Sequence, residues 1–114
     1  MPLLQIHTNQ TLDGDTQSDL LREASALVAG QLGKPERYVM VRIDDGQAML
    51  FAGSDAPLAY LELKSIGLPA DATPDLSAAL CTLIGERLGI AQDRIYIEFS
   101  NAERHLWGWD GRTF

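Results

Sequence analysis

Apolar residues alternate with polar ones in several short stretches of this chain, and this period of two predicts β-strands. The predicted strands are Pro2–His7, Tyr38–Ile43, about Met49–Gly53, Leu58–Ser65 and Ile95–Ser100. The dipeptide Asp45-Gly46 follows the second strand and is a tight-turn signal. It predicts a hairpin that returns the chain through the short strand near Met49.

Two other stretches repeat their apolar residues every three or four positions, which predicts amphipathic helices. The apolar stripes consist of Leu20, Ala24, Leu27, Val28 and Leu32 in the first helix, and of Leu76, Leu80, Leu83, Ile84 and Leu88 in the second. Thr16 or Ser18 is expected to cap the first helix, and Thr73, which precedes a proline, the second. Gly33 and Gly89 stand where a left-handed residue ends a helix.

The order strand, helix, strand occurs twice, at an offset of roughly 57 residues. Leu4-Gln5-Ile6 aligns with Leu61-Glu62-Leu63, for example, and Arg37-Tyr38-Val39 aligns with Arg94-Ile95-Tyr96. A strand-helix-strand unit places its two strands parallel, with a right-handed crossover. The chain is therefore expected to be one domain over 1–114, with pseudo-repeats at about 2–53 and 58–114. The expected fold class is α+β, an α/β sandwich with a four-stranded mixed sheet and two helices on one face.

Alternation along the strands assigns apolar side chains to the sheet face under the helices and a polar set to the other face. The polar set is Gln5, His7, Tyr38, Met40, Arg42, Tyr60, Glu62, Lys64, Tyr96 and Glu98. The chain has no further helix to cover this second face. It therefore faces water or lines something built from several copies, and its aromatic residues and the short edge strands favour assembly.

Composition and charge exclude several classes of protein. Apolar residues make up 46% of the chain and charged residues 22%, which is typical of a globular protein. Sixteen acids against nine bases give a net charge of −7, which argues against nucleic acid as a partner. No apolar stretch is long enough to span a membrane, and no signal peptide is visible, so a cytoplasmic location is expected, with secretion by another route left open.

The usual catalytic motifs are missing, but the N-terminus offers an unusual base. His7 and His105 lack metal-ligand spacing, and no glycine-rich phosphate loop is present, so neither metal nor cofactor is expected. Methionine is normally removed before a small residue, which would leave Pro2 as an N-terminal secondary amine. An α-amine has a pKa of roughly 7.7–8.0, and burial beside cations lowers it, so such a proline can act as a general base. Alternatively, Pro2 is simply a proline tolerated at the start of a strand.

A set of short motifs, in order along the whole chain, resembles the macrophage migration inhibitory factor family of the tautomerase superfamily, which includes D-dopachrome tautomerase. These motifs are Met1–Asn9, Leu32–Pro35, Ala52–Ser54, Ser65–Gly67, Glu86–Leu88, Asp93–Ile97, Gly108-Trp109 and Thr113-Phe114. The resemblance implies a homotrimer whose sheets surround a central channel. It also implies keto-enol tautomerisation of phenylpyruvate-like α-keto acids, with no cofactor.

The resemblance also implies roles for individual residues. Pro2 would be the general base, Lys34 would hold the substrate carboxylate, and Ile66 would offer its backbone N–H to the same group. Four aromatic residues match positions near the family pocket, with Tyr96 reaching in from a neighbouring subunit. They are Tyr38, Tyr96, Trp109 and Phe114.

The chain departs from the family pattern at three places. Glu98 replaces an asparagine beside the subunit-contributed tyrosine, where it would lie near the ring of the substrate, and Trp107 replaces a smaller apolar residue. The Cys-x-x-Cys position reads Leu58–Leu61, so thiol-redox chemistry cannot use that motif. Two other functions stay open: a cytokine-like binding protein with a vestigial pocket, whose receptor the sequence does not identify, and a related reaction at the same proline, such as dehalogenation or hydration.

Overall fold

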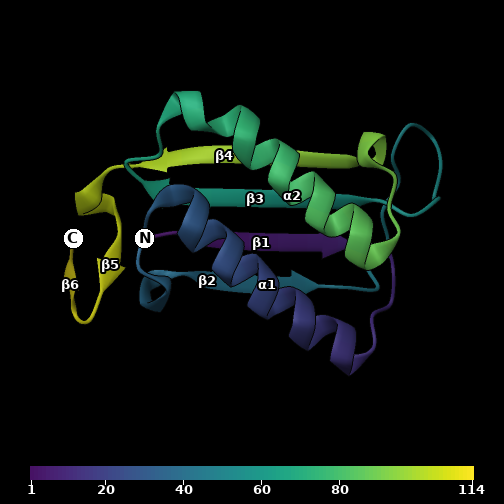
Figure 1. The fold of residues 1–114 in the computed structure, drawn as a ribbon, viewed down its shortest axis with the longest axis horizontal. Coiled ribbons are helices and arrows are strands. Elements are labelled where there is room, and N and C mark those ends of the chain that lie inside the picture. Colours follow the sequence, from purple (N-terminus) through teal and green to yellow (C-terminus); the bar gives the residue numbers. More distant parts are fainter.

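Two long helices lie side by side on one face of a four-stranded sheet, and the opposite face is uncovered (Figure 1). The computed structural model describes residues 1–114. The sheet consists of β1 (Leu3–Thr8), β2 (Met40–Asp44), β3 (Ala59–Ile66) and β4 (Ile95–Ala102), and the helices are α1 (Gly14–Leu32) and α2 (Thr73–Leu88). A small separate hairpin of β5 (Gly108–Trp109) and β6 (Arg112–Thr113) ends the chain. Neither long helix is apolar enough to cross a membrane.

The strand order β2-β1-β3-β4 follows from the two repeats. Each repeat supplies a parallel pair, β1 with β2 and β3 with β4, and the two repeats join where β1 runs antiparallel to β3. The expected four-stranded mixed sheet with two helices on one face is confirmed.

The core lies between the helices and the apolar sheet face. Both helices bury one residue per turn through the middle of their predicted stripes, and the two central strands bury alternate residues. The side chains with 0–1% exposure include Leu20, Ala24 and Val28 of α1, Leu76, Leu80 and Ile84 of α2, and Leu4, Ile6, Leu61 and Leu63 of the sheet. Full burial of one such leucine contributes about 1.5–3 kcal/mol, so the stripes fix which faces meet.

The helix ends agree with the sequence on the C-terminal side but not on the N-terminal side. Gly33 and Gly89 are left-handed, with φ of 62° and 67°. The prediction that Thr16 or Ser18 caps α1 is wrong, because the Asp13 carboxylate accepts the backbone N–H of Thr16 at 2.7 Å and the helix starts earlier. Thr73 is the first residue of α2 rather than its cap.

The predicted strand at about Met49–Gly53 is also wrong. Only one isolated bridge, between Phe51 and Ser54, forms there. The turn after β2 is tied back to the loop after β1 instead: Asp45 accepts the N–H of Leu12 at 2.8 Å, and Gly46 donates to Gln10 at 2.8 Å. These bonds hold the chain beside the loop, so it cannot return along β2.

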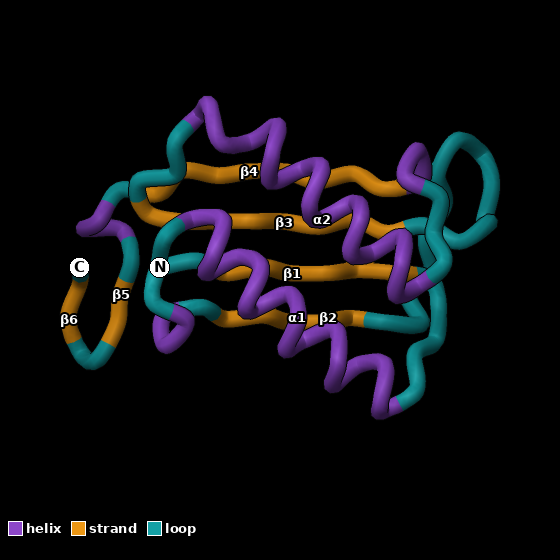
Figure 2. The backbone as a smooth tube through the Cα atoms, in the orientation of Figure 1, coloured by secondary structure: helices purple, strands orange, loops and turns teal.

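All four strands begin or finish at one end of the sheet. β1 and β2, which are parallel, begin there, and β3 and β4, which run antiparallel to β1, finish there. The C-terminal hairpin lies at the same end of the sheet, next to the N-terminus (Figures 1 and 2). The 3₁₀ turn η1 (Glu36–Tyr38) leads into β2 there. At this end of the sheet, side chains from distant parts of the sequence can combine into a site.

Candidate functional site

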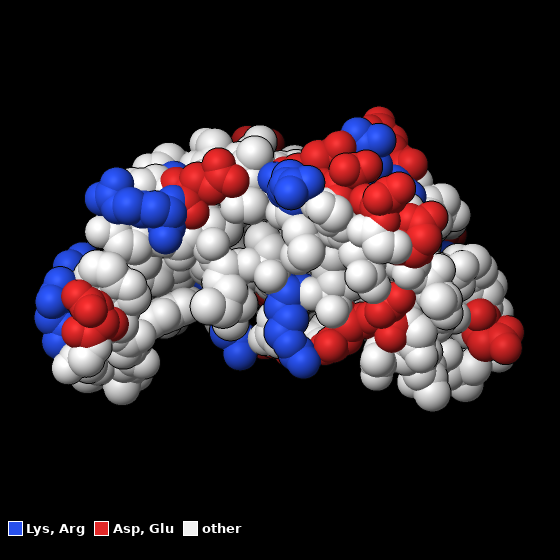
Figure 3. All heavy atoms as spheres, turned by 90° about the horizontal axis from the view of Figure 1, so that it is seen from below, with Lys and Arg blue, Asp and Glu red and all other residues white.

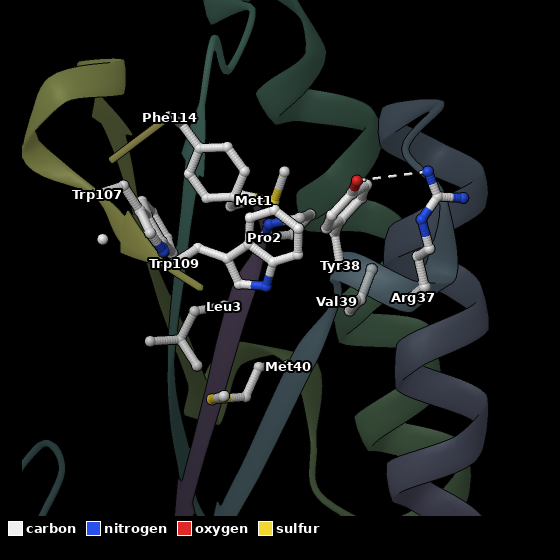
Figure 4. A pocket seen from close by; sticks show the side chains of 11 residues that line it. Met1, Pro2, Leu3, Arg37, Tyr38, Val39, Met40, Trp107, Trp109 and Phe114 are labelled. Atoms are coloured by element: carbon white, nitrogen blue, oxygen red, sulfur yellow. Dashed lines mark hydrogen bonds between the residues drawn. The ribbon is translucent and has the colours of Figure 1, made fainter. Parts of the chain in front are cut away.

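A cavity of about 270 Å³ opens at the end of the sheet where β1 begins. Eleven residues line it, eight of them hydrophobic. They come from three segments: the N-terminus, the η1 turn with the start of β2, and the C-terminal hairpin (Figure 4). The cavity approaches the size of ordinary small-molecule sites, and its apolar lining suits a flat, apolar ligand.

Pro2 lies at the inner end of this cavity. Its side chain is fully buried, and its carbonyl accepts the N–H of Met40 at 3.0 Å, which fixes it to the start of β2. The preceding Met1 amine shares the same surroundings. Burial lowers the pKa of this amine below its ordinary value of 8.0, and the charges of Lys34 and Arg104 lower it further. An amine at this position is thus biased toward the neutral form that can accept a proton.

Three aromatic rings form one wall of the cavity. Tyr38 meets Trp109 and Phe114 edge-on, with ring centroids 5.5 Å and 6.3 Å apart, and the last two stack with an interplanar angle of 10°. The C-terminus is held in place because Phe114 donates its N–H to the carbonyl of Trp107 at 3.1 Å. Three predicted pocket aromatics therefore lie together beside Pro2, and Trp107 lines the same cavity.

Lys34 and Ile66 meet just outside the cavity lining. The left-handed Gly33 turns the chain so that Lys34 leaves the end of α1 toward the sheet, and its Nζ donates to the Ile66 carbonyl at 3.3 Å. Ile66 is the last residue of β3. The two residues thus lie at the same end of the sheet as Pro2. The role of the Ile66 N–H stays a prediction.

Tyr96 and Glu98 lie elsewhere within one chain. Both are on β4, on the open face of the sheet, and neither lines the cavity at Pro2. The Tyr96 ring is 4.5 Å from the ring of Phe51. A role for these two residues beside Pro2 therefore requires a neighbouring subunit, as the resemblance implies.

Glu98 belongs to a hydrogen-bonded cluster on that open face. The Tyr60 hydroxyl lies 3.0 Å from both a Glu62 and a Glu98 carboxylate oxygen, and Gln5 donates to Glu62 at 3.2 Å. The pKa of Tyr60 is raised well above its usual range, mainly by desolvation and to a smaller extent by the two carboxylates, so the phenol keeps its proton. The cluster fixes the position of Glu98 before any second subunit approaches.

Two arginines belong to the pocket region: Arg37, predicted only as the next candidate after Lys34 for the substrate carboxylate, and Arg104, which the sequence analysis missed. Arg37 lines the cavity, with its guanidinium 4.6 Å from the centroid of the Tyr38 ring. Arg104 acts on the terminal amine through its charge. Both lie in single 3₁₀ turns, whose side-chain directions no periodic pattern reveals.

Comparison with known proteins gives one consistent family. The family model described as "Macrophage migration inhibitory factor (MIF)" matches residues 1–114. A macrophage migration inhibitory factor homolog from Trichinella spiralis is 40% identical, with 100% of both chains covered, and the mouse factor is 34% identical, with 100% of this chain and 99% of the mouse protein covered. The solved structure of a homologue from Prochlorococcus marinus superposes with a TM-score of 0.93 at 43% identity, covering 98% of each chain.

Proposed function

Because the chain belongs to the macrophage migration inhibitory factor family, we propose that it is a cofactor-independent keto-enol tautomerase, an isomerase acting on phenylpyruvate-like α-keto acids. The family includes tautomerase-type and cytokine-like members. The observation that carries the proposal is the buried Pro2 in an aromatic cavity, in surroundings that lower the pKa of the adjacent Met1 amine.

The reaction uses the Pro2 nitrogen as a base once Met1 has been removed. The neutral amine takes a proton from the carbon between the aromatic ring and the keto group, and the electrons of that C–H bond form the C=C bond of the enol. The electrons of the C=O π bond move to the keto oxygen, and the prolyl ammonium returns its proton to that oxygen, directly or through water. The amine is thereby regenerated, and the step balances without a cofactor. Only the neutral amine has the lone pair this requires.

The rest of the site suits the two ends of the substrate. The ring packs against the wall formed by Tyr38, Trp109 and Phe114, because aromatic faces and edges favour contact with another aromatic ring. Lys34 supplies the cation for the substrate carboxylate. Its ammonium contacts Ile66 at the same end of the sheet as Pro2, which supports this assignment.

The active form is proposed to be a homotrimer, in which the open sheet faces surround a channel and Tyr96 and Glu98 reach the pocket of a neighbour. Large apolar side chains stay exposed along the open side, among them Met40 and Tyr96, each 65% exposed, and Leu50, 69% exposed. Their exposure in a single chain supports assembly.

A cytokine-like binding protein is the second candidate. Family membership supports it, because the family includes cytokine-like members. This function would not need a basic Pro2 nitrogen, so it would also suit a protein that keeps Met1, in which that nitrogen is an amide. In that case the cavity would be a vestigial or purely binding pocket.

The test is enol-keto exchange of phenylpyruvate, followed by absorbance across pH, with protein shown by intact mass to begin at Pro2. We expect the rate to rise with pH as the prolyl ammonium deprotonates, with a midpoint lowered by burial and by the charges of Lys34 and Arg104, the causes that lower the pKa of the adjacent Met1 amine. Pro2→Gly keeps an amine at the same place, so it should weaken the activity without abolishing it. A Met1-free protein with no turnover would contradict the proposal and leave the binding protein.

A further inference from the structure

One charged side chain lines the cavity, and it lies at the outer lip rather than beside Pro2. Apart from the neutral Tyr38 hydroxyl and the indole N–H groups of Trp107 and Trp109, Arg37 supplies the only polar side-chain group among the lining residues, and the only charged one. The two groups lie together: the Arg37 Nη2 is 3.4 Å from the Tyr38 Oη, and the guanidinium projects away from Pro2 on the far side of the ring (Figure 4). The cavity is thus apolar along its length and cationic at one lip.

Arg37 has no acidic partner, although the chain carries sixteen acids and nine bases. Four other bases have a carboxylate within 4.0 Å, namely Arg42, Lys64, Arg87 and Arg112, whereas Arg22, Lys34, Arg94 and Arg104 have none. Among the bases without a carboxylate partner, Arg37 is the one that lines the cavity. Arg37 donates only the long hydrogen bond to Tyr38. Because a guanidinium has five N–H donors, most of its capacity is left for a ligand.

The sheet order places Arg37 and Lys34 on opposite sides of Pro2. Lys34 contacts Ile66 at the end of β3, whereas Arg37 precedes β2, and β1 lies between these two strands. A ligand carboxylate bound by Lys34 therefore leaves Arg37 free for a second group. Figure 3 shows the same bias on a larger scale: Lys and Arg gather toward the end that carries the hairpin, and Asp and Glu predominate toward the other end.

We propose that Arg37 selects α-keto acids with a second anionic group, namely arylpyruvates that carry a carboxylate on the side of the ring away from the keto acid. The inference rests on the proposed tautomerase function and adds its substrate class. In this arrangement Lys34 binds the keto-acid carboxylate, the aromatic wall holds the ring, and Arg37 binds the distal carboxylate at the lip. A planar guanidinium is well suited to a carboxylate, because it can donate two parallel hydrogen bonds.

The test compares 4-carboxyphenylpyruvate with phenylpyruvate and uses the ratio of their kcat/KM values. In Arg37→Gln this ratio should fall roughly three- to tenfold relative to the unaltered protein, mainly through KM, as expected for a partly exposed charge pair. The ratio cancels any general effect of the substitution on Tyr38 or Pro2. The matched control is Arg87→Gln, which removes the same charge from an ion pair with Glu23 on the helix layer, away from the cavity. Its ratio should stay within twofold of the unaltered protein.

The outcomes separate this inference from the function beneath it. Turnover of phenylpyruvate with a ratio that Arg37→Gln leaves unchanged would overturn the role of Arg37 alone. An equal fall in Arg87→Gln would also overturn it, because the effect would then come from net charge. No turnover of either substrate by Met1-free protein would overturn both proposals.

Discussion

Lys34 owes its place to the way α1 ends. Gly33 adopts φ of 62°, a conformation that glycine reaches at little cost, and the backbone N–H of Lys34 then donates to the Ala29 carbonyl at 3.0 Å. The ammonium consequently points to the end of β3 instead of continuing along the helix. The sequence could identify Lys34 through its motif after a helix-ending glycine, but the contact with Ile66 depends on strand order.

Lys34→Ala should raise KM for phenylpyruvate by roughly tenfold and lower kcat less, because the carboxylate is bound equally in the ground and transition states. The measurement is steady-state kinetics on Met1-free protein. Arg22→Ala is the control, since the one side-chain hydrogen bond of Arg22 is to Ser18 on the same helix and Arg22 does not line the cavity at Pro2. An unchanged KM would assign the carboxylate to another cation, with Arg37 the next candidate.

At the scale of elements, the turn-favouring dipeptide Asp-Gly occurs twice in the chain, but only one of the two copies connects the strands of a hairpin. Asp110 and Gly111 have φ of 54° and 74° and connect β5 to β6, as two-residue hairpins require. Asp45-Gly46 makes no hairpin, because its side chain and N–H bond to the loop after β1. Local sequence shows that a turn is favoured, whereas the partner of the next segment is decided by contacts distant in sequence. The hairpin that carries Trp109 pairs locally, but its strands have two residues each, which is too short for an alternating pattern to predict them.

Gly111→Ala should weaken this hairpin by about 1–2 kcal/mol, because a left-handed conformation is costly for alanine. Since β5 and β6 are outside the main sheet, KM for phenylpyruvate should rise roughly two- to fivefold while Tm falls by less than about 3 °C. Kinetics and thermal unfolding check this. Gly30→Ala is the matched control within α1, where alanine favours the helix, so Tm should rise and KM stay constant. A normal KM in Gly111→Ala would show that the hairpin does not shape the pocket.

At the scale of the whole molecule, the sheet has one covered and one open face. Strand alternation and the repeat predict this division, including the polar set around Gln5, Glu62 and Lys64. Figure 3 shows that the open side is hollowed between the hairpin end and the opposite loop. The hydrogen bonds that join Tyr60 to Glu62 and Glu98 were beyond sequence reasoning, because they depend on the register between β3 and β4.

We predict a homotrimer in solution with the face that carries Gln5, Glu62 and Lys64 turned inward. Light scattering at micromolar concentration should give three times the chain mass. Leu50→Glu places a charge on the exposed apolar loop of the open side and should shift the protein toward monomer. Ala26→Glu adds the same charge to the exposed side of α1 and should leave the trimer intact. A monomer mass for the unaltered protein would contradict the prediction.

The central claim is that the Pro2 amine is the base, and one preparation divided in two tests it most directly. Half of a Met1-bearing sample is treated with methionine aminopeptidase, and intact mass verifies the N-terminus of each half. Phenylpyruvate enol-keto exchange is then measured in both halves under the same conditions. The account predicts activity only in the half that begins at Pro2, because an amide nitrogen has no basic lone pair. Equal activity in the half that retains Met1 would contradict it and leave Pro2 as a strand-starting proline.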